Sequence, residues 1–300
     1  MSEKNSEKKV TIIGLGQMGK KLAQIWSAEG YEVTVWNRSP EKAQDLNVHR
    51  VASDVTEAIS ANDVIAICVL DNSIVFDLLD RAGSIALAGR TIINFTTGSP
   101  GEVKNLETSL AAAGAYYLNG AIQVAPEQMA MSDTTILMAG SKNAFEQHRT
   151  LLDKLGGNIK YLGEKAAASP AMDLATLSWV YGSFLGLMYG VAFCRSEGIK
   201  LDQYRAVIGE IADSFLEFYK YEIGTIADNN YEISQSPMAI SITASQRIAD
   251  TAQFMGLDTR FTDAVAAMLA DTREQGLENA EVSALIKVVE KRARRRLSVG

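Results

Sequence analysis

Cysteine and histidine are scarce in this sequence, which contains two of each among 300 residues. Cys68 falls in an apolar stretch that predicts a buried strand, and Cys194 falls in a stretch that predicts a helix. We expect both to act as small apolar residues in a reducing compartment. His49 and His148 are far apart in the sequence, with no cysteine or carboxylate cluster at ligand spacing, so no metal site is predicted.

Basic residues are fewer than acidic ones: the chain has 29 lysine and arginine residues and 36 aspartate and glutamate residues, which gives a net charge of −7. We therefore expect a soluble cytoplasmic protein with no nucleic-acid partner. The sequence lacks an uninterrupted apolar run of ~18–20 residues, so no membrane span is predicted. Residues 1–9 are polar and charged, without the apolar region of a secretory signal. The basic stretch 291–296 is interpreted as a charged helix terminus rather than a binding patch.

The chain does contain a hydrophobic fraction of 47%, which supports a full core, and enough residues for two domains. Short apolar runs alternate with helical patterns up to residue 166, which predicts an α/β domain with a doubly wound, largely parallel sheet. Residues 167–300 carry only helical patterns and predict an all-α domain. The expected strands are 9–13, 31–36, 50–52, 63–69, 91–95, 115–118, 134–139 and 160–162. The expected helices are 20–30, 41–45, 54–61, 74–80, 103–113, 145–155, 171–196, 201–213, 215–229, 240–255, 259–274 and 281–296.

A glycine motif joins the first expected strand to the first expected helix. It reads Gly14-Leu15-Gly16-Gln17-Met18-Gly19 and fits the pattern G-x-G-x-x-G in a strand–turn–helix–strand context. The first glycine permits a tight turn, the second allows the backbone to approach a pyrophosphate, and the third allows close packing of helix and strand. The free N–H groups at the start of the helix suit phosphates. The motif predicts a Rossmann-type dinucleotide-binding domain, with chemistry in the loops 70–73, 96–100 and 121–129 at the carboxyl ends of the strands.

The residues after the second strand predict which dinucleotide is bound. An NAD-specific site places an acidic residue there to hold the ribose 2′-hydroxyl. This chain has Asn37, Arg38 and Ser39 instead, with Lys42 one turn further on, so no carboxylate repels a 2′-phosphate. Arg38 can hold that phosphate with its planar guanidinium group. We therefore predict NADPH as the cofactor, and expect Ser39 to cap a short helix that begins at Pro40.

The expected helix 171–196 has a broad apolar face that a small domain alone cannot cover. We expect this helix to connect the two domains and to be buried by a partner subunit. The sequence therefore predicts a homodimer.

A Rossmann-type half followed by a long helix and an all-helical half resembles the β-hydroxyacid dehydrogenase superfamily. Within it, the chain is similar to the NADPH-dependent imine reductases and reductive aminases from about residue 10 to residue 289. The resemblance is carried by the glycine motif and by the segments 36–39 (WNRS), 94–100 (NFTTGSP), 120–126 (GAIQVAP) and 168–175 (ASPAMDLA).

The position of a missing lysine implies the reaction. In the hydroxyacid dehydrogenases, the start of the long helix carries a lysine that acts as acid and base at the substrate oxygen. The matching residue here is Asp173, while Lys165 lies ahead of the helix and Leu177 replaces an asparagine one turn later. A carboxylate suits a cationic iminium group, whereas a carbonyl oxygen needs a proton donor. The resemblance therefore implies imine reduction rather than alcohol oxidation.

Two further residues are implied to act with Asp173. Tyr181 lies eight residues later, about two helical turns, and so falls on the same face. In the reductive aminases, an aspartate and a tyrosine at this spacing line the substrate pocket. Thr97 stands where some reductive aminases carry asparagine and many imine reductases carry serine or threonine, which favours imine reduction over condensation of a ketone with an amine.

The expected function is hydride transfer from NADPH to an imine or iminium ion, with reductive amination of carbonyl compounds by amines as a further reaction. The catalytic candidates are Asp173, Tyr181 and Thr97, in a pocket that helices of a second subunit complete. The implied cofactor contacts are Gly14, Leu15, Gly16, Gln17, Met18, Gly19, Asn37, Arg38, Ser39, Lys42, Leu70, Asp71 and Thr96. The implied substrate contacts are Trp179, Phe184, Met238 and Ser241. A β-hydroxyacid or semialdehyde dehydrogenase and a non-catalytic NADPH-binding sensor remain as alternatives.

Overall fold

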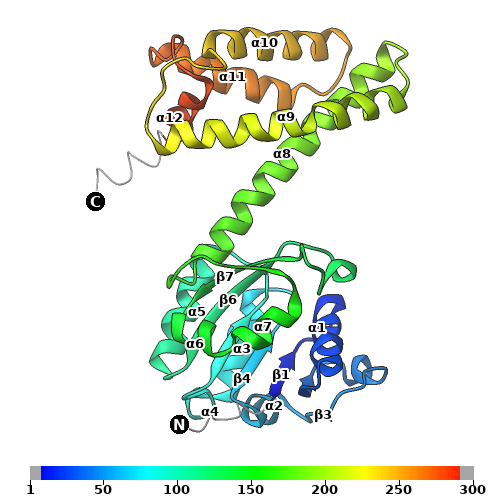
Figure 1. Cartoon of the computed structure of the whole chain (residues 1–300), viewed down its shortest axis with the longest axis vertical. Coiled ribbons are helices and arrows are strands. Elements are labelled where there is room, and N and C mark those ends of the chain that lie inside the picture. Colours follow the sequence, from blue (N-terminus) through cyan, green and yellow to red (C-terminus); the bar gives the residue numbers. More distant parts are fainter. Residues whose placement is uncertain (1–7, 291–300) are drawn as a thin grey trace. The chain divides into compact units, whose positions relative to one another are not determined.

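The computed structural model describes residues 8–290, which form two compact units, one up to Trp179 and one from Val180 onward. The first unit holds the β-sheet and the second is helical, as Figure 1 shows for each unit. This confirms the predicted α/β fold class with an all-helical C-terminal part. The division falls inside α8 (Ala168–Ser196), whereas the sequence pattern predicts a boundary at residue 166.

The first unit is built on an eight-stranded sheet in the order β3-β2-β1-β4-β5-β6-β7-β8. All neighbouring strands are parallel except β6 and β7, which are antiparallel. The chain reverses its direction of travel across the sheet between β1 and β4, which is where doubly wound folds bind their ligands. The strands are β1 (Lys9–Ile13), β2 (Glu32–Trp36), β3 (Arg50–Val51), β4 (Val64–Ile67), β5 (Thr91–Asn94), β6 (Tyr116–Ile122), β7 (Thr135–Gly140) and β8 (Asn158–Tyr161).

Helices cover both faces of the sheet, and each face has its own apolar core. One core joins α1 (Gln17–Ala28), α6 (Lys142–Gln147) and α7 (Arg149–Leu152), and the other joins α2 (Val55–Ala61), α3 (Asn72–Ala82) and α5 (Pro100–Ala112). Strand side chains alternate between the cores, so that Ile12 faces the first and Ile13 the second. The short elements of this unit are α4 (Ser84–Leu87) and the 3-10 helices η1 (Pro40–Ala43), η2 (Pro126–Gln128) and η3 (Asp153–Leu155).

Strand β6 extends four residues beyond the predicted end at Leu118. Its extension pairs with β7, from Leu118 opposite Gly140 to Ile122 opposite Ile136. A Cβ atom at Gly120 would lie 2.5 Å from a ring carbon of Phe95, so this glycine serves close packing against the neighbouring strand. The longer strand brings residues 119–122 to the carboxyl edge of the sheet.

The predicted helix 145–155 was wrong in its continuity, because the chain forms α6, α7 and η3 in succession. The break lies at His148, whose backbone leaves the helical region with φ −104° and ψ 15°. The predicted helix 41–45 is the 3-10 helix η1, in which Ser39 holds the N-cap position but its side chain makes no capping hydrogen bond.

The second unit contains α9 (Leu201–Ala227), α10 (Met238–Phe254), α11 (Arg260–Glu274), η4 (Val282–Leu285) and α12 (Ile286–Val289). Its apolar core gathers Met238, Ile242, Leu269 and Ala284 from α10, α11 and η4. The predicted break near residue 214 was wrong, since α9 continues through a stretch that holds neither proline nor glycine. Helix 281–296 was wrong within the described residues, which form η4 and α12, and residues 291–296 lie outside them.

Although it has no uninterrupted apolar run, α8 is long and apolar enough to cross a membrane, judged by length and composition alone. Helices that are covered by protein pass the same test. Many of its large apolar side chains, including Trp179, Phe184 and Met188, are exposed.

Candidate active site

The glycine turn between β1 and α1 has the geometry that close approach of a phosphate requires. Gly14 has a φ of +98°, and a Cβ atom there would lie 2.2 Å from the carbonyl oxygen of Cys68. A Cβ at Gly19 would lie 2.0 Å from the carbonyl oxygen of Gly14. Gly16, in contrast, is exposed and would meet no atom within 4 Å. The first and third glycines therefore serve packing, and the second leaves an open cradle for a ligand.

The N-terminus of α1 faces this cradle without a competing anion. Gly16 holds the N-cap position and provides no capping side chain, and the first turn contains no acidic residue. The N–H groups of that turn, at Gln17 and Met18, therefore keep the helix dipole available to phosphate groups. Leu15 is different, because its N–H donates to Oδ1 of Asn37 at 2.9 Å.

The loop after β2 presents two cations. Arg38 and Lys42 are exposed, and neither forms an ion pair with the described residues 8–290. The amide of Asn37 bridges the glycine turn and this loop, since its Nδ2 also donates to the carbonyl of Ser39 at 3.0 Å. The loop is thereby fixed beside the phosphate cradle. Its guanidinium, ammonium and Ser39 hydroxyl groups fit a 2′-phosphate.

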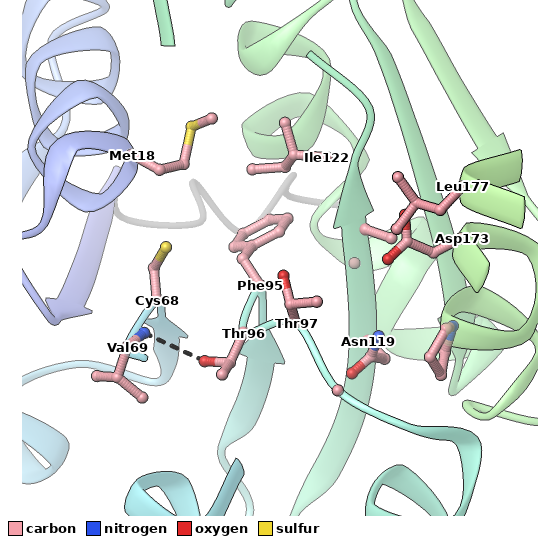
Figure 2. A pocket seen from close by; sticks show the side chains of 14 residues that line it. Met18, Cys68, Val69, Phe95, Thr96, Thr97, Asn119, Ile122, Asp173 and Leu177 are labelled. Atoms are coloured by element: carbon pink, nitrogen blue, oxygen red, sulfur yellow. Dashed lines mark hydrogen bonds between the residues drawn. The ribbon is translucent and has the colours of Figure 1, made fainter. Parts of the chain in front are cut away.

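A pocket of about 330 Å³ lies in the first unit at the carboxyl ends of β4 and β5. Figure 2 shows Asp173 and Leu177 at one side of it and Met18 and Cys68 at another. The lining residues are Met18, Cys68, Val69, Phe95, Thr96, Thr97, Gly98, Asn119, Gly120, Ala121, Ile122, Pro170, Asp173 and Leu177. The structure thus brings the predicted residues Met18, Thr96, Thr97 and Asp173 to one cavity.

The two threonines after β5 have different surroundings. Thr96 is buried, its N–H donates to Oδ1 of Asn94 at 3.0 Å, and its Oγ1 accepts from the Val69 N–H at 3.2 Å (Figure 2). Thr97 is exposed and lines the pocket. Thr96 therefore joins the loops after β4 and β5, while Thr97 remains available to a bound molecule.

Asp71 caps α3. Its Oδ1 accepts from the Ser73 hydroxyl at 2.6 Å and from the Ile74 N–H at 3.0 Å, and these bonds hold the pKa of the carboxyl group below its ordinary value. Leu70, just ahead of it, is exposed. The cap fixes the loop in which Leu70 lies.

Asp173 carries the one carboxylate among the lining residues of the pocket. Its side chain is only 9% exposed, although α8 is otherwise largely exposed around it. Nε2 of Gln123 donates to Oδ1 of Asp173 at 2.7 Å. Within residues 8–290 this amide is its only side-chain partner, so no cation neutralises the carboxylate.

A buried polar network that the sequence did not predict reaches the pocket at Asn119. Nδ2 of Asn94 donates to the hydroxyl of Tyr117 at 3.1 Å, which donates to Oδ1 of Asn119 at 3.1 Å. Nδ2 of Asn119 then donates to Oγ of Ser169 at 3.1 Å, at the start of α8. Burial raises the pKa of Tyr117, which keeps its phenol protonated as a donor. The available sequence signal was an asparagine at the end of the apolar run 91–94 and another directly after the apolar run 115–118.

The remaining predicted contacts lie further along the chain. Trp179 ends the first unit and is exposed. In the second unit, Tyr181 is 65% exposed, Phe184 is exposed, and Ser241 is half-buried near the start of α10. Met238 is fully buried in the core of that unit.

A doubly wound sheet with a phosphate-binding turn beside a pocket is the arrangement of a dinucleotide-dependent oxidoreductase. Residues 9–163 match the family model of the NAD binding domain of 6-phosphogluconate dehydrogenase. Residues 165–291 match the model of the C-terminal domain of NADPH-dependent reductive aminase-like proteins. The chain therefore belongs to the imine reductase and reductive aminase family of the β-hydroxyacid dehydrogenase superfamily.

Relatives agree with this assignment over nearly the whole chain. An NADPH-dependent reductive aminase of Aspergillus oryzae is 29% identical over 93% of this chain and 96% of its own length. The reductive aminase of Aspergillus terreus, solved in complex with NADPH4, cyclohexanone and allyl amine, superimposes with a TM-score of 0.84 at 28% identity, covering 94% of this chain and 99% of that one. The imine reductase of Myxococcus stipitatus in complex with NADP+ gives a TM-score of 0.86 at 27% identity and the same coverage.

Proposed function

We propose that this protein is an NADPH-dependent oxidoreductase that reduces imines or iminium ions to amines, and that the same pocket supports reductive amination of carbonyl compounds by amines. The observation that carries the proposal is the Asp173 carboxylate. It lies nearly buried in the pocket, without a cationic partner among the described residues, where the hydroxyacid dehydrogenases place a lysine. A negative group at this point favours a cationic substrate nitrogen.

The cofactor site fits NADPH. The open face of Gly16 and the first turn of α1 would hold the pyrophosphate, and Arg38 with Ser39 and Lys42 would hold the 2′-phosphate. When bound, NADPH supplies the hydride that the carbon of the C=N bond accepts.

The residues of the chain contribute charge, orientation and shielding. Asp173 stabilises the positive charge of an iminium nitrogen and retains the proton on that nitrogen as the amine forms. Tyr181, about two turns further along α8, positions the substrate or donates a proton. Phe95, Ile122 and Leu177 line the pocket with apolar surface, which excludes water from the reacting carbon. Thr97 adds a hydroxyl group on the sheet side of the pocket.

We also propose a cytoplasmic homodimer whose sites lie at the subunit interface. Two features support a second copy as the partner of the helical unit. Both α8 and α9 carry exposed apolar side chains, such as Phe215 and Ile223 on α9, and charged residues such as Glu210 and Glu217 lie among them. A surface of this mixed kind suits protein better than lipid. The two free cysteines, Cys68 and Cys194, suit a reducing compartment.

The central test replaces Asp173 with alanine. We expect kcat for a preformed cyclic imine to fall by about 100-fold or more, the scale of a lost acid–base or charge-stabilising group. The dissociation constant for NADPH, measured by fluorescence, should change little because no described contact joins Asp173 to the glycine turn.

A parallel assay with a β-semialdehyde separates the alternatives. Turnover of the imine by the wild-type protein, lost in D173A, supports the proposal. Turnover of the semialdehyde alone would replace it with a dehydrogenase function. Tight NADPH binding without turnover of either substrate would favour a sensor.

A further inference from the structure

Gln123 lies at a junction between the sheet and α8. Its backbone N–H donates to the carbonyl of Thr135 at 3.0 Å, which continues the pairing of β6 with β7 by one residue. Its side chain reaches α8, where Nε2 donates to Oδ1 of Asp173 at 2.7 Å. A residue whose backbone is held by the sheet thus contacts the carboxylate of the pocket directly.

Thr176 fixes the orientation of this amide. The Thr176 hydroxyl is 2.9 Å from Oε1 of Gln123 and 2.8 Å from the carbonyl oxygen of Asp173, and its single proton is shared between these two acceptors. An ionised carboxylate can only accept hydrogen bonds, so the NH₂ end of the amide must face Asp173. Oε1 then faces the hydroxyl donor. The hydrogen bonds among these three residues are therefore consistent with one orientation of the Gln123 amide.

The chemical character of the contact matters as much as its geometry. An arginine or lysine in the same place would neutralise the carboxylate and repel a cationic substrate. A neutral amide holds Oδ1 and leaves the negative charge in place. No described residue donates to Oδ2, which leaves that oxygen for a substrate N–H group. Figure 2 shows the carboxyl group beside Leu177 at the wall of the pocket.

We propose that Gln123, oriented by Thr176, is the positioning residue that holds the Asp173 carboxylate toward a cationic substrate nitrogen. The inference rests on the proposed function for the identity of the substrate. Gln123, at the end of β6, would thus support the catalytic carboxylate on α8 without itself contacting the reacting atoms.

The experiment compares Q123L, Q123E and T176V with the wild type. Q123L keeps the approximate size of the side chain and removes the donor. We expect its kcat for a cyclic imine to fall by about 10- to 100-fold, the cost of a misplaced catalytic group, with the NADPH dissociation constant within about twofold of wild type. T176V should change kcat in the same direction by about threefold, because it removes only the orienting bond.

Q123E gives a readout that a purely structural role would not produce. The carboxyl group that this substitution introduces can, when protonated, donate to Asp173 as the amide does, whereas two ionised carboxylates repel each other and share no donor. The ratio of kcat for Q123E to kcat for Q123L should therefore fall by about tenfold as the pair loses its shared proton with rising pH. Q123M replaces Q123L if the latter melts more than about 5 °C below wild type.

Binding of a saturated cyclic ammonium ion to the NADP+-loaded protein, measured by calorimetry, separates this inference from the proposed function. Weaker binding by Q123L supports the inference even if the wild type reduces no imine. Loss of activity in D173A alongside wild-type kcat and ammonium binding in Q123L would leave the function standing and overturn the inference. A pH-independent ratio of Q123E to Q123L would overturn it as well.

Discussion

Arg38 holds its charge in solvent beside the glycine turn, with no carboxylate paired to it among residues 8–290. Because Arg38 has no ion pair to give up, the full energy of a charge-assisted hydrogen bond to a phosphate contributes to binding. We therefore expect R38A to raise the dissociation constant for NADPH by about 10- to 100-fold, the range of a lost hydrogen bond to a charged group. The value for NADH, which lacks the 2′-phosphate, should stay within about threefold. Fluorescence titration with both cofactors measures the difference.

The matched control for R38A is K104A, which removes an exposed cation from α5 and should leave both dissociation constants unchanged. An equal loss of affinity for NADPH and NADH in R38A would contradict the 2′-phosphate assignment.

Residue types identified the pocket better than they identified individual contacts. Asp173, Thr96, Thr97 and Met18 line one cavity, and the predicted loops 96–100 and 121–129 both contribute residues to it. The Asp71 carboxylate, however, caps α3, a role that depends on the backbone angles of its own loop. The contact of Gln123 with Asp173 spans 50 residues and required the register of β6 and β7, which the sequence did not predict.

The connection between α9 and α10 is held at one carboxylate. Glu281, fully buried ahead of η4, accepts hydrogen bonds from the backbone N–H groups of Ser234, Gln235 and Ser236. Burial alone would raise the pKa of Glu281, but these donors outweigh it and lower the pKa to about 2. Since an unfolded glutamate titrates near ~4.3, this contribution to stability is present above that pH and is lost as the pH falls toward 2.

Glu222 on α9 has the opposite pH dependence. Its carboxyl oxygens are buried and accept no hydrogen bond from the described residues. Desolvation is the main cause that raises the pKa of Glu222, and the negative charge of Glu281 raises it further. A glutamate whose pKa is raised on folding costs stability as the pH rises above its unfolded value of ~4.3.

We therefore expect E222Q, which stays neutral, to melt above the wild type at pH 8 and level with it near pH 4. A gain of about 1 kcal/mol would correspond to a rise of about 2 °C in Tm for a chain of this length. The control is E217Q on the same helix, an exposed residue paired with Lys220, whose Tm difference from wild type should stay small and nearly constant with pH. Equal offsets of E222Q from wild type at pH 4 and pH 8 would show that ionisation of Glu222 carries no cost. Calorimetry at the two pH values measures both variants.

At the level of elements, strands were predicted from short apolar runs that alternate with helical patterns, and all eight exist. One error fell where tertiary contacts override local pattern. β6 continues through Gly120 because it pairs with β7 up to Ile122, and this pairing cannot be read from a single segment of sequence. The break predicted near residue 214 was an error of another kind, since the sequence there holds no proline or glycine that would end α9.

For the whole molecule, the exposed apolar side chains of α8 and α9 are the feature that the single chain leaves unexplained. Contiguous exposed apolar patches are uncommon in monomers, and in the dimer proposed above a second copy covers these side chains. Sedimentation of the purified protein should give the mass of a dimer, twice the 32.5 kDa of one chain. A monomer at micromolar concentration would contradict the proposal.

A shared site makes a stronger prediction about mixed dimers. D173A removes the carboxylate from the sheet unit, and S241W blocks the half-buried position on α10 in the helical unit. If each site takes its sheet unit from one chain and its helical unit from the other, a heterodimer of these variants contains one doubly altered site and one intact site. Co-expression with two different affinity tags isolates that heterodimer, and we expect about half the imine-reducing activity of the wild-type dimer from it. Each homodimer should be nearly inactive. A site built within one chain would leave both sites of the heterodimer altered, so an inactive heterodimer, with the thermal stability of its parents, would place the catalytic residues of each site in a single subunit.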